Sequence, residues 1–546
     1  MADRMNTNQT PLILPAAWLS LVAACCFAPF DVAGAPSATP VRASEDGVWQ
    51  AALNTPPGQT RRPPWLPPGK GREFKLNHGM LRSLLARAPR EFPPEARRDA
   101  PVVTLPMPDG SFARFHVVES PIMEPELAAK FPELKTYSGQ GLDEPTATVR
   151  FDTSPTGLHA LVVSARGPVF VDPMTETDSD LYASVRREDL PSEWEGLRCD
   201  TQPGNPAPAV DLAAFASAAV NPAVVLRTYR LALAARGEYT QFHGGTVAGA
   251  LAAIVTSVNR VNSIYERDLA IRMVLVANED RIIYLDPLTD PYPNLNNSTS
   301  VDDNQANLDA VIGSANYDVG HVVNQRILPG GIAWVGSACD PLNKAKGSTS
   351  VHYPAGPAFE VDYFGHELGH QFGAGHTYNG TNHFCTLDQY WPLAAFEPGS
   401  GSTIMSYVAS CGSDDLQPIG SPFFHSGSYA EITSYITSGT GASCPLPVIT
   451  GNRAPTVSAG PNYTIPKGTP FTLTAMGSDP DGDTLTYSWE EHDLGPPQPL
   501  TGPGSADNGS SPLFRTFDPT TNASRTFPKL EALLSHTPSH GETISV

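Results

Sequence analysis

A chain of 546 residues is too long for one hydrophobic core and predicts three or more structural units. Its formal net charge of −21, from 56 acidic and 35 basic residues, argues against nucleic-acid binding and for an exported, soluble protein. Prolines (55) and glycines (46) are abundant and charged residues are only 17%, which favours loop-rich and β-rich architecture. No apolar run after residue 30 is long enough to span a bilayer, so we expect no transmembrane segment.

The N-terminus predicts an export signal over residues 1–35. Arg4 precedes an apolar run over 15–24, and Ala33-Gly-Ala35 supplies the small residues of a cleavage site. We expect cleavage after this triplet and a secreted, extracellular protein. An alternative lies in the same stretch, because the Val-Ala-Ala-Cys sequence that ends at Cys25 resembles a lipoprotein box and would leave the protein lipid-anchored there.

The chain changes character twice before residue 223. Residues 36–72 contain three proline pairs, which disfavour packing and predict a linker. Residues 73–222 alternate strand-like apolar runs with turn signals, so they predict a β-rich unit, and they carry no catalytic constellation of their own. The expected elements are a helix over 80–85 and strands over 102–105, 115–118, 147–151 and 158–163.

Residues 223–447 predict a unit in which strands alternate with helices. Apolar side chains recur every three to four residues between 245 and 267, which predicts a long helix. The other expected elements are strands over 226–233, 270–276, 318–323 and 331–335 and a helix near 307–312.

The most informative stretch of this unit is Phe364-Gly-His-Glu-Leu-Gly-His-Gln-Phe-Gly-Ala-Gly-His376. In a helix, His366 and His370 lie one turn apart on the same face, so both imidazoles can bind one zinc ion. Gly373 lacks a Cβ and can enter the left-handed region at little cost, which ends the helix and returns the chain. The turn brings His376 beneath the same ion as a third ligand.

Three protein ligands leave a fourth zinc position open, which distinguishes a catalytic site from a closed structural one. Zinc lowers the pKa of its water to about 7 and polarises a carbonyl. Glu367 follows the first ligand, lies to the side of the metal, and can accept the proton of that water as general base. The predicted reaction is hydrolysis of an amide bond.

The extended motif and the downstream Ser402-Thr-Ile-Met-Ser-Tyr407 together resemble the metzincin zinc endopeptidases. That family has His-Glu-x-x-His-x-x-Gly-x-x-His followed by a methionine turn. The resemblance implies that Met405 forms a hydrophobic floor beneath the zinc. It also implies that Tyr407 ligates the zinc or stabilises the oxyanion, as a tyrosine at that place does in astacin-like and serralysin-like members.

Features of the sequence conflict over the branch of the metzincins that it resembles. The residue sequence Gly365-His-Glu-Leu-Gly-His370 and the spacing of the cysteines resemble those of the reprolysin-like (adamalysin-type) proteases. Members of that branch, however, usually have proline at the position of Tyr407. Thr377, directly after the third histidine, matches no branch. We therefore interpret the domain as a reprolysin-like bacterial secreted protease.

Five cysteines remain once the signal is removed, and four of them surround the zinc motif. In an oxidising compartment these four can form two disulfides, in three alternative pairings. We favour Cys339–Cys444, which ties the end of the domain to a strand before the zinc helix, and Cys385–Cys411, which staples the segment around the methionine turn. This pattern is similar to that of reprolysins.

The fifth cysteine, Cys199, lies just before the catalytic unit. A thiolate binds zinc well, so it could fill the open position and act as a latency switch. The alternative is a thiol without a role. Because residues 73–222 lie upstream of the catalytic unit, we interpret them as a propeptide, which could be an inhibitory chaperone or a permanent accessory domain. If Cys199 is a latency switch, activation requires a cut between 200 and 222.

The third unit spans residues 452–546. Expected strands over 463–465, 471–474 and 484–489 resemble an immunoglobulin-like or PKD-like β-sandwich that the chain leaves incomplete. The acidic turn over 479–483 could bind Ca²⁺ through its oxygens. Such sandwiches serve bacterial exported enzymes as spacers or as modules for attachment to a cell surface or matrix.

The sequence thus predicts a multidomain protein: a β-rich propeptide, an α/β metzincin domain and a C-terminal sandwich. Its function would be zinc-dependent cleavage of a protein or peptide substrate after release from a latent precursor. Two alternatives stay open, a zinc-binding adhesion protein without turnover and a zinc hydrolase of a non-protein amide. His321 is expected to be a strand histidine near the cleft, and residues 331–334 could be the edge strand that pairs with substrate.

Overall fold

The structure is a computed structural model. The signal segment, Cys25 and residues 203–222 of the expected cleavage window between 200 and 222 lie outside the residues that it describes. The described ranges are 43–52, 63, 65–92, 94–175, 180–191, 198–202, 223–293, 297–326 and 330–544.

The N-terminal region forms one nine-stranded sheet in which every neighbouring pair is antiparallel, in the order β1-β2-β9-β8-β7-β6-β5-β4-β3. Strand β1 lies within the predicted linker, where it pairs with β2, so part of that segment belongs to the sheet. The elements are β1 Trp49–Ala51, β2 Arg72–Leu76, α1 His78–Leu85, η1 Pro94–Asp99, β3 Val102–Pro106, β4 Phe112–Glu119, α2 Pro125–Lys130, β5 Lys135–Gly141, β6 Thr148–Ser154, β7 Gly157–Val163, β8 Val169–Pro173, β9 Leu181–Arg186 and η2 Arg187–Asp189.

A second sheet carries the zinc motif. Its strand order is β10-β14-β15-β13-β11-β12, with β16 pairing antiparallel to β11. The pairs along this order are parallel except for β14 with β15. The strands are β10 Arg198–Gln202, β11 Ala223–Ala235, β12 Ile271–Leu275, β13 Val319–Gln325, β14 Gly330–Trp334, β15 Gly347–Val351 and β16 Leu446–Arg453. Strand β16 extends past residue 447, so the sheet continues beyond the expected end of this unit.

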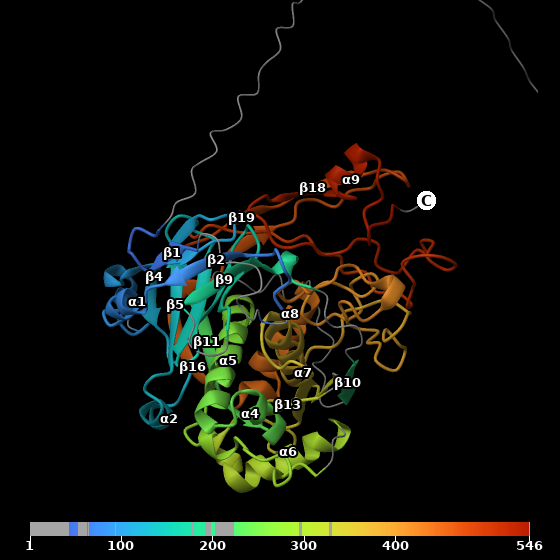
Figure 1. The fold of residues 1–546 in the computed structure, drawn as a ribbon. Helices are drawn as coiled ribbons and strands as arrows, with labels where there is room; N and C mark the ends of the chain where they lie inside the picture. Colours follow the sequence, from blue (N-terminus) through green and yellow to red (C-terminus); the bar gives the residue numbers. More distant parts are fainter. Residues whose placement is uncertain are drawn as a thin grey trace, which may run out of the picture. The chain divides into compact units, whose positions relative to one another are not determined.

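Helix α5, the long green helix in Figure 1, has the shorter α4 beside it. The Thr246 side chain accepts a hydrogen bond from the N–H of Gly249 at its start, and Ala270 ends it in the left-handed conformation. It is long and apolar enough to span a membrane by length and composition, but 78% of that window is buried inside the protein. The helices are α4 Gly237–Phe242, α5 Val247–Leu269, η3 Glu279–Arg281, α6 Asn297–Val311, η4 Ser314–Asn316, the π-helix η5 Ala358–Phe364, α7 Gly365–Gln371, η6 Gly412–Asp414, α8 Ser426–Ser438 and η7 Thr440–Ala442.

The two sheets share one hydrophobic core through α5. Leu161 and Phe170 of the N-terminal sheet belong to the same buried cluster as Ile254 and Val258 of α5. Buried charges cross the same contact: Arg150 of β6 pairs with Glu266 of α5 at 2.7 Å. The N-terminal sheet therefore covers the face of α5 that would otherwise meet water.

The C-terminal region has little regular structure. Its elements are β17 Thr456–Ser458, β18 Phe471–Thr474, β19 Met476–Ser478, β20 Ser524–Phe527 and α9 Leu530–Ser535, and the strands pair as two separate ribbons, β17–β19 and β18–β20. Of the strands expected there, 471–474 forms. Residues 463–465 form none, because Tyr463 and Ile465 are 66% and 44% exposed and have no face to pack against, and 484–489 contributes one bridge at Tyr487. Among the described residues these ribbons do not close into a sandwich.

Two carboxylates of the acidic turn at 479–483 are already paired with groups of the protein itself. The Asp479 carboxylate accepts hydrogen bonds from the N–H groups of Asp481 and Asp483 at 2.8 and 3.1 Å, and Asp481 pairs with Arg453 at 2.8 Å. Calcium binding at this turn therefore stays a prediction.

Candidate active site

The zinc motif forms a short helix with a sharp end. The π-helix η5 leads directly into α7, and the Gly365 carbonyl accepts a hydrogen bond of 2.7 Å from the Tyr265 hydroxyl of α5. Gly373 then takes φ +101°, a conformation that strains any residue with a Cβ. The chain reverses at this glycine, as the sequence predicts, and returns to the helix with His376.

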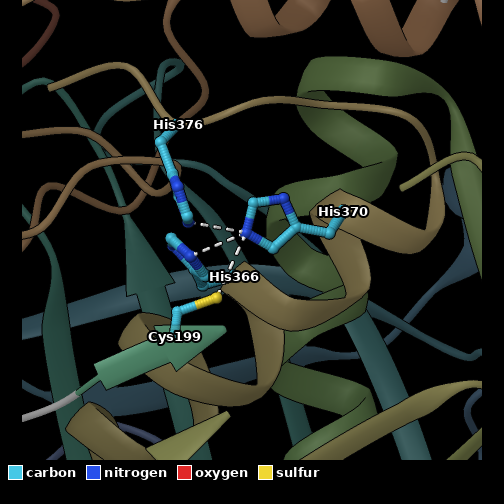
Figure 2. Close-up of side chains that lie close together, drawn as sticks. All are labelled: Cys199, His366, His370 and His376. Carbon is cyan, nitrogen blue, oxygen red and sulfur yellow. Dashed lines mark hydrogen bonds between the residues drawn. The ribbon is translucent and has the colours of Figure 1, made fainter. Parts of the chain in front are cut away.

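The three histidines converge on one point (Figure 2). Nε2 of His370 lies 3.0 Å from Nε2 of His366 and 3.0 Å from Nε2 of His376, and all three side chains are buried. The Nδ1 atom of each histidine faces a backbone carbonyl oxygen. His366 faces Ile404 at 2.7 Å, His370 faces Ala374 at 2.7 Å, and His376 faces Gln389 at 2.8 Å.

This arrangement fits a metal ion. Because each Nδ1–H donates to a carbonyl, each Nε2 carries a lone pair, and three lone pairs cannot hydrogen-bond to one another. Burial lowers the pKa of His366 to about 4 and holds the pKa values of His370 and His376 well below the usual range, so the rings are neutral. A cation would stabilise these three atoms, of which His370 Nε2 lies 3.0 Å from each of the other two, and three imidazoles are a typical ligand set for zinc.

Glu367 is buried beside the ligands and interacts with the Cys199 thiol, but within the described part of the chain neither of its carboxylate oxygens has a hydrogen-bond partner at bonding distance. Burial raises its pKa to about 8. Gly331 of β14 lies directly against this carboxylate, so a Cβ at that position would overlap it. An unpartnered buried acid needs a substrate, water or ion to satisfy it, which is typical of functional sites.

Cys199 enters the same cluster from β10 (Figure 2). Its sulfur lies 3.4 Å from Nε2 of His370, and its ligand atom and those of the three histidines all lie within 4.8 Å of one another. Strand β10 runs parallel to β14 with Cys199 opposite Gly331. The strand that the sequence offered as a substrate-binding edge is therefore paired with β10 in this structure.

The methionine turn lies against the zinc helix. Met405 is fully buried, and its carbonyl accepts a hydrogen bond of 3.0 Å from the N–H of Thr377. Its sulfur packs on Gly369, between two of the histidines along α7, so closely that a Cβ at Gly369 would overlap it. A side chain at position 369 would therefore force the methionine to shift.

Tyr407 lies next to the histidines but binds the N-terminal segment. Its ring centroid is 4.5 Å from that of His376, and its hydroxyl donates a hydrogen bond of 2.5 Å to the Cys199 carbonyl. The same side chain thus contacts a predicted zinc ligand and the strand that covers the site.

A residue that the sequence analysis missed connects the third histidine to the methionine turn. The buried Glu397 carboxylate accepts hydrogen bonds from the hydroxyls of Thr377, Ser402 and Thr403 and from the N–H of Ser402. No local motif marks this glutamate, because its partners precede and follow it in the chain and meet only in the fold.

Two further expectations can be compared with the structure. His321 on β13 is buried, with its ring nitrogens 2.9 Å from Gln371 Oε1 and 2.9 Å from Thr349 Oγ1, so it is a strand histidine and takes no part in the cluster. The disulfides are Cys339–Cys444 and Cys385–Cys411, the two pairs favoured from the sequence.

Comparison with known proteins agrees with this geometry. The sequence model of the metallo-peptidase family M12B, reprolysin-like, matches residues 225–436. This stretch is a reprolysin-like metzincin domain, and the chain that carries it is a zinc metalloendopeptidase. No curated protein matches the chain. Among solved structures, metalloproteinase-II from Bacteroides fragilis is similar with a TM-score of 0.36 and 10% identity, over 65% of this chain and 94% of that one.

Proposed function

We propose that the protein is a secreted zinc endopeptidase, made as a latent precursor, in which Glu367 is the general base. The observation that carries the proposal is the combination of three neutral imidazoles that share one point and, beside them, a buried carboxylate that has no hydrogen-bond partner among the described residues. His366, His370 and His376 would hold the zinc. When bound, zinc supplies a Lewis acid for the substrate carbonyl and lowers the pKa of a water molecule to about 7.

The protein's own groups have separate roles in the reaction. Glu367 accepts the proton of the attacking water and delivers it to the leaving amine. The backbone of β14 pairs with an extended substrate through main-chain hydrogen bonds that tolerate many side chains. Tyr407, once its hydroxyl is released from the Cys199 carbonyl, donates a hydrogen bond to the developing oxyanion. Met405 supports the ligands from below.

Strand β10 would keep the precursor latent by covering the active site. This strand occupies the edge of β14 and puts the Cys199 sulfur into the ligand cluster, so it competes with substrate backbone and with water at the same time. Cutting the chain between residues 202 and 223 would free β10 to leave. The N-terminal sheet then acts as a propeptide that holds this strand in place.

Secretion is supported by the two disulfides, which form and persist in oxidising compartments. The proposal also includes an extracellular location after cleavage at Ala35, with a lipid anchor at Cys25 as the alternative, and calcium at the acidic turn and attachment through the C-terminal region, all of which rest on the sequence.

Two other functions stay as outcomes of the test, a zinc-binding adhesion protein without turnover and a hydrolase of a non-protein amide. The experiment is cleavage of unfolded casein by the zinc-loaded full chain after limited proteolysis between 202 and 223, with and without a zinc chelator. We expect cleavage that the chelator abolishes and added zinc restores. No cleavage by processed, zinc-loaded protein would favour one of the two alternatives.

A further inference from the structure

A pocket adjoins the zinc ligands on the side of the methionine turn. In the full chain its cavity volume is about 20 Å³, room for about one water molecule, and Asp362, Tyr363, Ile404, Tyr407 and Gly420 are among its walls. Two of these walls touch the ligands directly, because the Ile404 carbonyl accepts from His366 and the Tyr407 ring packs on His376. A substrate side chain in this pocket would therefore belong to a residue next to the scissile bond.

The pocket carries one charge. Its described lining residues are tyrosine, threonine, serine, proline, glycine and aliphatic residues, apart from Asp362, which lies one helical turn before His366. Gly420 stands so close that a Cβ there would press on the Asp362 carboxylate. The glycine leaves this carboxylate accessible to a partner.

In the full chain the partner is an arginine from the N-terminal region. Arg187 of η2, which is 3% exposed, donates through Nη2 to the Asp362 carboxylate and through Nε to the Gly420 carbonyl. These two acceptors match the fork of a guanidinium. Two residues of the pocket wall, Asp362 and Gly420, thus already bind a guanidinium, the chemical group that we infer for the substrate.

We propose that Asp362 makes the freed enzyme select an arginine, and less strongly a lysine, next to the scissile bond, and that Arg187 takes the place of that side chain in the precursor. The inference rests on the proposed function. Asp362 is 20% exposed in the full chain, and when the N-terminal region leaves it loses its cation, which favours a new basic partner. Arginine is preferred because its planar guanidinium presents two N–H donors in fixed positions to the carboxylate and the carbonyl.

The test compares kcat/KM for matched peptides. Pairs of peptides carry arginine or glutamine at each position flanking the cut, and lysine or norleucine in a second series. The enzyme is the zinc-loaded full chain carrying Arg187→Gln, after limited proteolysis between 202 and 223, so that the competing guanidinium is absent. The same chain with Asp362→Asn added is the test variant, and Asp302→Asn, an exposed change on α6, is the matched control.

We expect the arginine peptide to exceed the glutamine peptide roughly tenfold or more at one flanking position in Arg187→Gln and in the Asp302→Asn control. Adding Asp362→Asn should bring the ratio close to one. If Asp362→Asn leaves the ratio of kcat/KM between the arginine and glutamine peptides unchanged, the inference is overturned. Partial misfolding of a variant lowers both kcat/KM values equally, so it does not change this ratio. If no variant cuts any peptide, the proposed function is contradicted, and the inference, which depends on that function, is contradicted as well.

Discussion

The sulfur of Cys199 lies 3.4 Å from Nε2 of His370, although 171 positions separate the two residues in the chain. The contact depends on register, because β10 sets Cys199 opposite Gly331 of the edge strand β14. A slip of one residue would turn the sulfur to the other face of the sheet. The proposed latency switch would thus depend on strand pairing as much as on the cysteine.

Replacing this cysteine should weaken latency. Cys199→Ala removes a sulfur from the ligand cluster but leaves the backbone pairing of β10, so we expect the unprocessed chain to cleave casein about tenfold faster than wild type, equivalent to about 1.4 kcal/mol. Arg198→Gln changes the same strand at an exposed position and is the control. Equal activity of Cys199→Ala and the control would show that the thiol contributes nothing to latency.

Glu397 should hold the third histidine and the methionine turn together. In Glu397→Gln an amide N–H₂ replaces an acceptor that faces hydroxyl and N–H donors, so we expect a loss of about 1–3 kcal/mol in the free energy of unfolding. We also expect faster loss of zinc on dialysis, measured by metal analysis. The exposed Glu133→Gln should change neither quantity. Normal zinc retention in Glu397→Gln would limit this residue to a structural role.

The fit between Gly369 and Met405 can be tested by a double-mutant cycle. Gly369→Ala places a methyl group in the space of the sulfur, so overpacking should cost about 1–3 kcal/mol of stability. In a Met405→Ala background the same change should cost much less, because the space is then empty. Denaturant unfolding of the four proteins measures the coupling. Additive losses would mean that the two side chains do not press on each other.

The contact between the N-terminal region and β12 should be sensitive to acid. Burial works against the charge of Glu91, but Arg272 at 2.8 Å and Arg150 outweigh it and hold its pKa at about 2. A carboxyl with a lowered folded-state pKa contributes stability above its unfolded value of 4.5 and loses that contribution as the pH falls toward 2. The full contribution is on the order of 3 kcal/mol.

The variant Glu91→Gln therefore should lower stability near pH 6 and flatten the fall of stability between pH 4.5 and pH 2. Unfolding by urea at a series of pH values, compared between wild type and Glu91→Gln, measures this difference. Parallel stability curves for the two proteins would contradict the assigned role of the ion pair.

The zinc site could be expected from the sequence because its parts are local. Helical spacing fixes His366 relative to His370, and the glycine at 373 is required by a left-handed turn that the structure contains. The helix and strands of this unit also follow from periodicity, as α5 shows. Such features depend on neighbours within a few turns of chain.

Other features could not be expected, because they depend on pairing between distant segments. The Arg187–Asp362 ion pair joins residues 175 positions apart, and neither residue stands in a recognisable motif. The C-terminal strands were expected from alternation alone, but alternation gives a sheet only where a second layer covers the apolar face, and Tyr463 remains exposed. Strand β1 formed in a proline-rich stretch because β2 offered it an edge.

The most direct test of the account is casein cleavage by processed, zinc-loaded Glu367→Gln beside wild type. The amide keeps the shape of the carboxylate but cannot accept the proton, so we expect activity to fall by at least about 10³-fold, in keeping with the loss of a catalytic base. Zinc content should stay at one ion per chain, because the three histidines are untouched. Substantial cleavage by Glu367→Gln at full zinc occupancy would contradict the assignment of Glu367 as the general base.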